Sequence, residues 1–198
     1  YGPTGRNFHS MVLIPPSMSA TADPVHGDLL MCAGLSSSSQ ALNDCWRLNL
    51  GTFKWTQASN SAFTVGRYGG AMTVYTNSKG VTQILYMGGR SSSAVFKELW
   101  ISTSLGTSWR RHTLYFGCAS HHLISIGLNL YAGFSGRTET TFSIGPTDPN
   151  TASLYHSVDG GISWSEVTSA LPYLTQGDGR HTVINWGGDI FVGGGITG

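Results

Sequence analysis

Aromatic residues that recur at a nearly constant spacing constrain the fold of this chain more than any other feature of its sequence. One set lies at intervals of 54 and 55 residues: Trp55, Trp109 and Trp164. A second set lies nine residues before the first in every copy: Trp46, Trp100 and Tyr155. Two sets that stay in step along the chain indicate an internal repeat, and therefore a fold built from similar units.

Each unit contains short runs in which apolar and polar residues alternate, separated by turn residues. In the first unit the predicted strands are 8–14, 28–34, 44–50 and 53–58, and in the second they are 69–76, 82–89, 97–103 and 108–113. In the third, two strands join around 127–129 and two more flank the turn at 159–161. A fourth unit supplies only 181–186 and 189–195. No stretch long enough to form a helix has helical periodicity, so the predicted class is all-β.

Glycine motifs recur with the same period. Gly-Arg pairs open units at 5–6, 66–67 and 179–180, although the third unit has 118–122 instead. Glycines end the second strands at 33–34, 88–89, 132–133 and 193–194. The Asp-box pattern Ser-x-Asp-x-Gly-x-x-Trp is matched in full by Ser157, Asp159, Gly161 and Trp164. Over essentially its whole length the chain resembles kelch and Asp-box β-propellers, whose blades are four-stranded antiparallel sheets.

This resemblance implies a single propeller segment over residues 1–198 with about 3.5 blades. The expected blades are about 5–60, 66–115 and 118–170, with a half-blade at about 179–198. Closed propellers have roughly four to eight blades, so an open arc would leave strand edges unpaired. We expect the rest of a longer chain, or a second protomer, to complete the ring. The longer chain is favoured because propellers normally close within one chain.

Charged residues are scarce and almost balanced in sign. They form 11% of the chain, against roughly 25% in typical soluble domains, and the net charge is +1. The lysines and arginines are scattered, so no nucleic-acid partner is predicted. No apolar run approaches the roughly 18 residues that a membrane span needs. A surface rich in serine, threonine and glycine favours an extracellular or cell-surface protein.

Three cysteines leave a question of oxidation state. Cys32 and Cys45 lie in two apolar-rich runs joined by a polar loop, so they can face each other across one hairpin. A disulfide between them and two free buried thiols are both open alternatives. Cys118 is left without a partner in either case.

The Asp-box is structural in the family that the chain resembles. The resemblance implies that Asp159 accepts hydrogen bonds from backbone N–H groups of its own turn, that Gly161 adopts a positive φ and that Trp164 packs between sheets. The second unit keeps the serine, glycine and tryptophan of this pattern but carries Ser104 in place of the aspartate. We therefore expect a scaffold role for these turns.

Arginines are the candidate ligand-binding residues. Arg6, Arg67 and Arg180 precede first strands, so in a propeller they would meet near the channel mouth and could grip a carboxylate or a sulfate. Two further candidates, Arg90 and Arg137, lie in loops that follow second strands. The phasing of the first three arginines favours another role, in which each bonds loop carbonyls of its own blade.

The sequence offers little support for an enzyme. Glycoside hydrolysis uses paired carboxylates, but Asp44 and Glu98 recur at equivalent positions, which a structural role explains. The Phe-Arg-Ile-Pro start of sialidases is absent. His121 and His122 are adjacent in a predicted strand and so point to opposite faces, which does not favour a metal site. No catalytic residue, cofactor or metal is predicted.

We therefore expect a non-catalytic recognition or structural module outside the cytosol that binds a protein or a glycan. Its binding face is predicted to carry the serine-rich loops 36–39 and 91–93 and the long insertion 135–151. Two alternatives stay open. One is a sialidase-like glycoside hydrolase that uses the phased arginines, and the other is a subunit of an extracellular polymer joined through unclosed strand edges.

Overall fold

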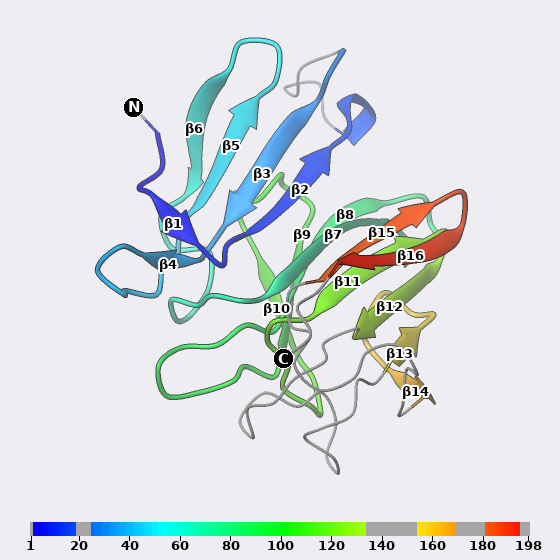
Figure 1. Ribbon diagram of the computed structural model, residues 1–198. Coiled ribbons are helices and arrows are strands. Elements are labelled where there is room, and N and C mark those ends of the chain that lie inside the picture. The colour runs from blue at the N-terminus through cyan, green and yellow to red at the C-terminus, as the bar shows by residue number, and fades with distance from the viewer. Residues whose placement is uncertain (1, 19–24, 134–153, 169–180, 195–198) are drawn as a thin grey trace.

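The protein is described by a computed structural model that covers residues 2–18, 25–133, 154–168 and 181–194 (Figure 1). These residues are all-β and form antiparallel sheets. Within them the only helix is the three-residue 3-10 turn η1 (Pro16–Met18). The all-β class predicted from the sequence is therefore confirmed.

Three of the sheets have four strands each, and their strands follow the same spatial order as the chain. The first sheet contains β2 (Ser10–Ile14), β3 (Asp28–Cys32), β5 (Cys45–Asn49) and β6 (Lys54–Ser59). The second contains β7 (Ala71–Thr76), β8 (Thr82–Met87), β9 (Glu98–Ser102) and β10 (Arg110–Thr113). The third contains β11 (His122–Ile126), β12 (Asn129–Gly133), β13 (Leu154–Ser157) and β14 (Ser165–Thr168). A hairpin of β15 (His181–Trp186) and β16 (Asp189–Gly194) follows.

All the strands predicted from the sequence are present, and their ends agree within two residues wherever bounds were predicted. The structure adds one small pair that was not predicted, in which β1 (Arg6–Asn7) lies antiparallel to β4 (Leu35–Ser36). Each of these strands has two residues, which is too short for an alternating pattern to be recognised in a sequence.

Glycines form the tight turns of the hairpins. Gly187 and Gly188 have φ values of 65° and 96° and form the two-residue turn between Trp186 and Asp189, where both positions need positive φ. Gly27 precedes β3 with a φ of 76°, and a Cβ atom there would lie 2.2 Å from the carbonyl oxygen of Ile14. The first hairpin therefore requires glycine at this position.

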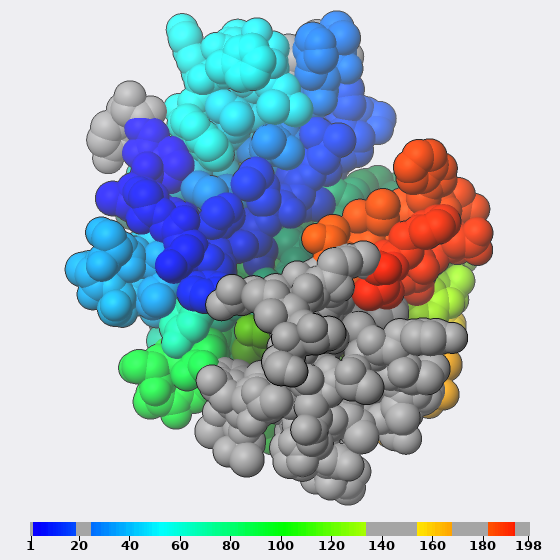
Figure 2. All heavy atoms as spheres, in the orientation of Figure 1, coloured from blue at the N-terminus to red at the C-terminus, as the bar shows by residue number. Residues whose placement is uncertain are grey.

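Neighbouring sheets meet through their first strands. β2 contacts β7, β7 contacts β11, and β11 contacts β15 (Figure 1). The fourth strands, β6, β10 and β14, form the opposite edges of their sheets. The hairpin of β15 and β16 lies at the surface of the molecule (Figure 2).

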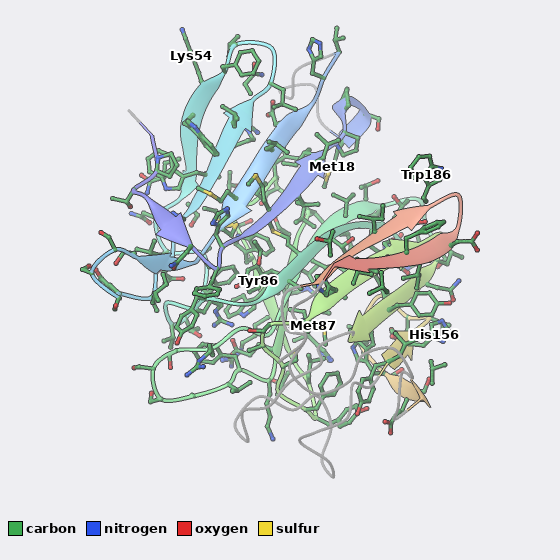
Figure 3. All side chains as sticks on the ribbon, in the orientation of Figure 1. Met18, Lys54, Tyr86, Met87, His156 and Trp186 are labelled. Carbon is green, nitrogen blue, oxygen red and sulfur yellow. A yellow bond between two sulfur atoms is a disulfide. The ribbon has the colours of Figure 1, made fainter. Side chains whose placement is uncertain are left out.

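Two apolar clusters fill the spaces between the sheets. The cluster between the first and second sheets includes Ile14, Leu30, Cys32, Met72, Ile84, Tyr86 and Trp100. The cluster between the second and third sheets includes Tyr75, Leu85, Met87, Leu99, Leu123, Leu130 and Tyr155. Tyr86 and Met87 lie in the centre of the molecule, whereas Trp186 lies at its periphery (Figure 3). The second sheet is therefore covered on both faces.

In the second and third sheets the recurring aromatic residues lie in equivalent surroundings. Phe63, in the connection before the second sheet, has its ring centroid 5.5 Å from those of both Trp100 and Trp109. Phe116, before the third sheet, packs in the same way against the two aromatic residues of that sheet, with centroids 4.9 Å from Tyr155 and 6.4 Å from Trp164. These two phenylalanines are a third repeating set, 53 residues apart, that the sequence analysis missed.

Candidate functional site

An arginine, a carboxylate and a tryptophan form a hydrogen-bonded network in the first sheet. Arg6 donates from Nη1 to Asp44 Oδ1 over 2.6 Å and from Nη2 to Oδ2 over 2.9 Å. Nη1 also donates to the carbonyl oxygen of Ala33 over 3.0 Å, and Trp46 Nε1 donates to Asp44 Oδ2 over 2.6 Å. The network joins β1 to the end of β3 and to the start of β5.

The second sheet contains the same network. Arg67 Nη2 donates to Glu98 Oε2 over 2.8 Å, and Nη1 donates to the carbonyl oxygen of Gly88 over 3.2 Å. Trp100 Nε1 donates to the same Oε2 over 2.9 Å. The guanidinium also stacks on Phe96, with its Cζ 4.2 Å from the ring centroid. In both sheets the arginine thus donates to a carboxylate, and the tryptophan two residues after that carboxylate donates to it as well.

In these networks the two arginines bind groups of their own sheets. The side chain of Arg67 has no exposed surface and that of Arg6 is 2% exposed. Burial lowers the pKa of Arg67, and the hydrogen bond that Arg67 donates to Glu98 opposes that change. Burial alone would raise the pKa of Asp44, but hydrogen bonds from Arg6 and Trp46 outweigh it and hold the pKa below its ordinary value. Arg6 and Arg67 therefore stabilise their own sheets and do not converge on a shared ligand site.

Of the other three arginine candidates, the structure describes only Arg90. Arg90 lies beside the second sheet with its guanidinium carbon 5.3 Å from the centroid of the Tyr68 ring, and its Nε donates to the carbonyl oxygen of Ser91 over 3.3 Å. Arg137 and Arg180 lie outside the described residues. The third unit has Cys118 at the position of the arginine, so the network does not recur there with the same residues.

The Asp-box residues close the turn between β13 and β14. Asp159 Oδ1 accepts from the backbone N–H groups of Ile162 over 3.0 Å and Ser163 over 2.9 Å. Ser157 Oγ donates to the same Oδ1 over 2.8 Å and accepts from the N–H of Gly161 over 2.9 Å. Gly161 has a φ of 88°. All of these contacts lie within the turn, so Asp159 acts as a scaffold residue.

Electrostatics and packing fit this scaffold role. Burial would raise the pKa of Asp159, but the hydrogen bonds from Ser163, Ser157 and Ile162 prevail and lower it. Trp164 is 8% exposed, and its Nε1 donates to the carbonyl oxygen of Gly161 over 2.9 Å. The indole therefore fixes the turn to the apolar cluster between the second and third sheets.

The turn between β9 and β10 has the same construction with a serine in place of the aspartate. Ser104 Oγ accepts from the N–H of Ser108 over 3.0 Å, and Ser102 Oγ accepts from the N–H of Gly106 over 3.0 Å. Gly106 has a φ of 85°, close to the 88° of its counterpart. Trp109 Nε1 donates to the carbonyl oxygen of Gly106 over 3.1 Å. The sequence pattern thus identified two equivalent turns.

This equivalence gives a prediction for stability. Asp159→Ala removes the acceptor for four donors and is expected to lower the free energy of unfolding by about 1–2 kcal/mol, as for the loss of a capping carboxylate. Ser104→Asp restores the full pattern in the other turn and is expected to raise it by about 0.5 kcal/mol. Urea unfolding of both variants measures these changes. A loss above about 1 kcal/mol in Ser104→Asp would show that the two turns differ.

All three cysteines and one histidine, His121, are buried. Cys32 and Cys45 form a disulfide between the neighbouring strands β3 and β5. Cys118 is a free buried cysteine, and burial raises the pKa of its thiol. Its Sγ lies 3.6 Å from Nε2 of the buried His121. Within the described part of the chain, no group of three or more His, Cys, Asp or Glu residues is placed to hold a metal ion.

The serine-rich loops are closed by their own side chains. Ser36 Oγ lies 2.9 Å from Ser38 Oγ and accepts from the N–H of Gln40 over 3.1 Å. Ser91 Oγ accepts in the same way from the N–H groups of Ser93 and Ala94, each over 3.2 Å. These hydroxyls shape the loops. The insertion at 135–151, which the sequence analysis also placed on the binding face, lies outside the described residues.

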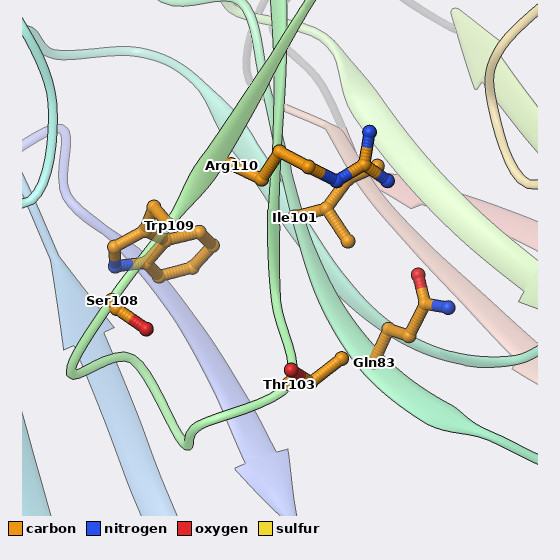
Figure 4. A pocket seen from close by; sticks show the side chains of 6 residues that line it. All are labelled: Gln83, Ile101, Thr103, Ser108, Trp109 and Arg110. Atoms are coloured by element: carbon orange, nitrogen blue, oxygen red, sulfur yellow. The ribbon is translucent and has the colours of Figure 1, made fainter.

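A pocket of about 300 Å³ opens at the end of the second sheet where β9 turns into β10 (Figure 4). Six side chains from three strands and one turn line it: Gln83, Ile101, Thr103, Ser108, Trp109 and Arg110. The sequence analysis missed this site, because its polar members carry no motif and come together only when β8, β9 and β10 are paired.

No protein-family model matches the chain, and no curated protein matches it. The described residues also contain no helix that is long and apolar enough to cross a membrane.

Proposed function

We propose that the chain is an open segment of a β-propeller of the kelch or Asp-box kind and that it works as a non-catalytic recognition or structural module outside the cytosol. Its ligand is a protein or a glycan. The disulfide between Cys32 and Cys45 supports an oxidising compartment, where such bonds persist.

The arrangement of the sheets supports the propeller. Sheets that share one strand order and touch through their first strands are arranged around a common inner side. The buried tryptophans and the two buried phenylalanines Phe63 and Phe116 then occupy the spaces between successive blades. Radial stacking of four-stranded sheets is the architecture of propellers.

The two ends of this arc have exposed apolar side chains. On the β15–β16 hairpin, Ile184 is 48%, Phe191 52% and Trp186 74% exposed. On the first sheet, Met11 and Leu13 of β2 are 45% and 50% exposed. We propose that these faces are covered by further blades, supplied by the rest of a longer chain or by a second protomer.

The strand order restricts what can cover the hairpin. Because β15 contacts β11, the hairpin corresponds to the two inner strands of a blade, and β16 is the strand to which a third would pair. We propose that the segment that covers the hairpin supplies the outer strands of this blade.

The engagement of Arg6 and Arg67 is the observation that carries the non-catalytic function. A sialidase needs free guanidinium groups for the carboxylate of its substrate, but both of these are bound to carboxylates of their own sheets. In addition, the pocket at the end of the second sheet contains no carboxylate among its six lining residues, whereas glycoside hydrolysis uses two.

A paired assay of binding and hydrolysis tests this function. The protein is applied to a panel of immobilised glycans and extracellular proteins, and in parallel to a fluorogenic sialoside. We expect saturable capture on the panel and no fluorescence release above that of buffer. Release that rises with protein concentration and is lost in Arg6→Lys would establish the sialidase alternative instead.

The exposed ends of the arc also favour a second candidate, a subunit of an extracellular polymer. In such a polymer the hairpin of one copy contacts the first sheet of the next copy. This head-to-tail contact repeats indefinitely if the rotation between successive copies does not close a ring. Sedimentation over a hundredfold range of protein concentration tests it. Growth of the sedimentation coefficient with concentration supports a polymer, and a constant monomeric value excludes it.

A further inference from the structure

The pocket at the end of the second sheet combines an immobilised aromatic ring with unused polar groups. The Trp109 ring is held on one side by Phe63, 5.5 Å away between centroids, and by the bond from its Nε1 to Gly106. Neither contact depends on a ligand. The indole is thus held in place without a ligand, and Trp109 is one of the six residues that line the pocket (Figure 4).

Three polar side chains of the pocket have no hydrogen-bond or ion-pair partner within the described residues. They are Gln83 from β8, Thr103 from the end of β9 and Arg110 from β10. The next residue, Arg111, points to the other side of the strand, where its Nη1 lies 3.4 Å from Glu98 Oε1. Arg110 is therefore available to a ligand, unlike Arg6 and Arg67.

The chemistry of the lining specifies the ligand. Arg110 is the one charged side chain among the six residues, so the pocket favours an anion, and a guanidinium binds a carboxylate through two parallel hydrogen bonds. An amide and a hydroxyl beside it can bond hydroxyl groups. The indole offers an apolar surface to the C–H face of a ring. A volume of about 300 Å³ is at the lower limit of ligand pockets, which fits one ring.

We propose that this pocket binds a single carboxylate-bearing sugar unit of a glycan. Arg110 holds the carboxylate, Gln83 and Thr103 hold hydroxyl groups, and the sugar ring lies against Trp109. This assignment rests on the proposed recognition function and names the ligand class for it. It places the site on the second sheet, away from the phased arginines and from the serine-rich loops.

Titration with methyl glucuronide, followed by NMR, tests the assignment. We expect saturable shifts of the Trp109 indole N–H and of the Gln83 side-chain amide. Methyl glucoside, which lacks the carboxylate, and acetate, which lacks the ring, are expected to bind at least about tenfold more weakly, the loss of one charge-assisted contact. Equal binding of acetate would overturn the sugar assignment, and equal binding of the glucoside would overturn the role of Arg110.

Matched variants locate the site. Arg110→Gln and Gln83→Glu, which places a carboxylate beside Arg110, are each expected to weaken glucuronide binding at least about tenfold. Arg111→Gln makes the same change of charge one residue away and is expected to stay within about twofold, since its side chain lies outside the pocket. Equal weakening in Arg110→Gln and Arg111→Gln would show a diffuse charge effect and overturn the site.

The outcomes also separate this assignment from the proposed function. If the protein captures other glycans or proteins and does not bind the glucuronide, the assignment fails and recognition stands. If the glucuronide is hydrolysed at this pocket, the non-catalytic function fails even though the pocket takes the expected ligand. Absence of saturable shifts up to tens of millimolar glucuronide overturns the assignment.

Discussion

Arg67→Met is expected to lower the free energy of unfolding by about 3–5 kcal/mol, which is the usual effect of removing one partner of a buried ion pair. The substitution leaves Glu98, whose side chain is 15% exposed, without its strongest partner. It also frees the carbonyl oxygen of the buried Gly88 and removes the guanidinium that stacks on Phe96. Loss of this size is a large fraction of the stability of a typical domain, about 5–15 kcal/mol.

Arg111→Met is the matched control for this effect. Arg111 bonds the same carboxylate over 3.4 Å, but its side chain is 51% exposed. Exposed pairs contribute about 0–1 kcal/mol, so this variant should stay within about 1 kcal/mol of the wild type. Urea unfolding followed by tryptophan fluorescence measures both variants. Similar losses in the two variants would contradict the assignment of Arg67 as the buried anchor of the second sheet.

The positions of the strands are predictable from the sequence because they rest on local patterns. Alternation of apolar residues and turn glycines such as Gly187 and Gly188 act within a few residues, and both recur from unit to unit. The Asp-box is predictable for the same reason, since Asp159 bonds groups within four residues of itself. Repetition then confirms each local pattern, because a chance match would not recur in step.

The arginine networks are harder to predict because their partners are distant in the chain. Arg67 and Glu98 are 31 residues apart, and Arg6 and Asp44 are 38 apart. The sequence shows that the arginines and the carboxylates each recur, and it suggests a structural role for both. It does not show that they bind each other. The arginines and the carboxylates recur with the same period and have opposite charges, and this shared period is the signal that would have identified them as partners.

The pocket has no such signal. Gln83, Thr103 and Arg110 do not belong to any repeated set, and their proximity depends on the pairing of three strands. A functional role is therefore hardest to predict from the sequence for residues that do not belong to the repeat. In this chain the repeated residues build the sheets, and a residue outside the repeat supplies the guanidinium that is available to a ligand.

The third unit departs from the repeat most clearly at Cys118, which stands where the first two units have arginine. Here the buried polar group is a histidine: His121 is 5% exposed, and its Nδ1 is buried without a hydrogen-bond partner among the described residues. Burial, and to a smaller extent the neighbouring His122, lowers the pKa of His121 to about 3. The imidazole is therefore neutral in the folded protein.

This neutral histidine predicts that the fold is weakened by mild acid. An unfolded histidine has a pKa of about 6.5, so below that pH the unfolded chain binds a proton that the folded chain does not bind. Stability from this group is fully present above about pH 6.5 and is lost as the pH falls toward 3. Between pH 7 and pH 5 the loss is expected to be about 2 kcal/mol. Burial also lowers the pKa of His9, which adds to the loss in the same direction.

His121→Leu separates this histidine from every other acid-sensitive group. At pH 7 the variant is expected to keep the wild-type stability within about 1 kcal/mol, because it removes the unpartnered Nδ1 and loses only the long contact of 3.6 Å between Nε2 and Cys118 Sγ. Between pH 7 and pH 5 its free energy of unfolding should change by about 2 kcal/mol less than that of the wild type. Since Asp44 and Asp159 titrate below this range, an unchanged slope in His121→Leu would mean that His121 is protonated in the folded protein.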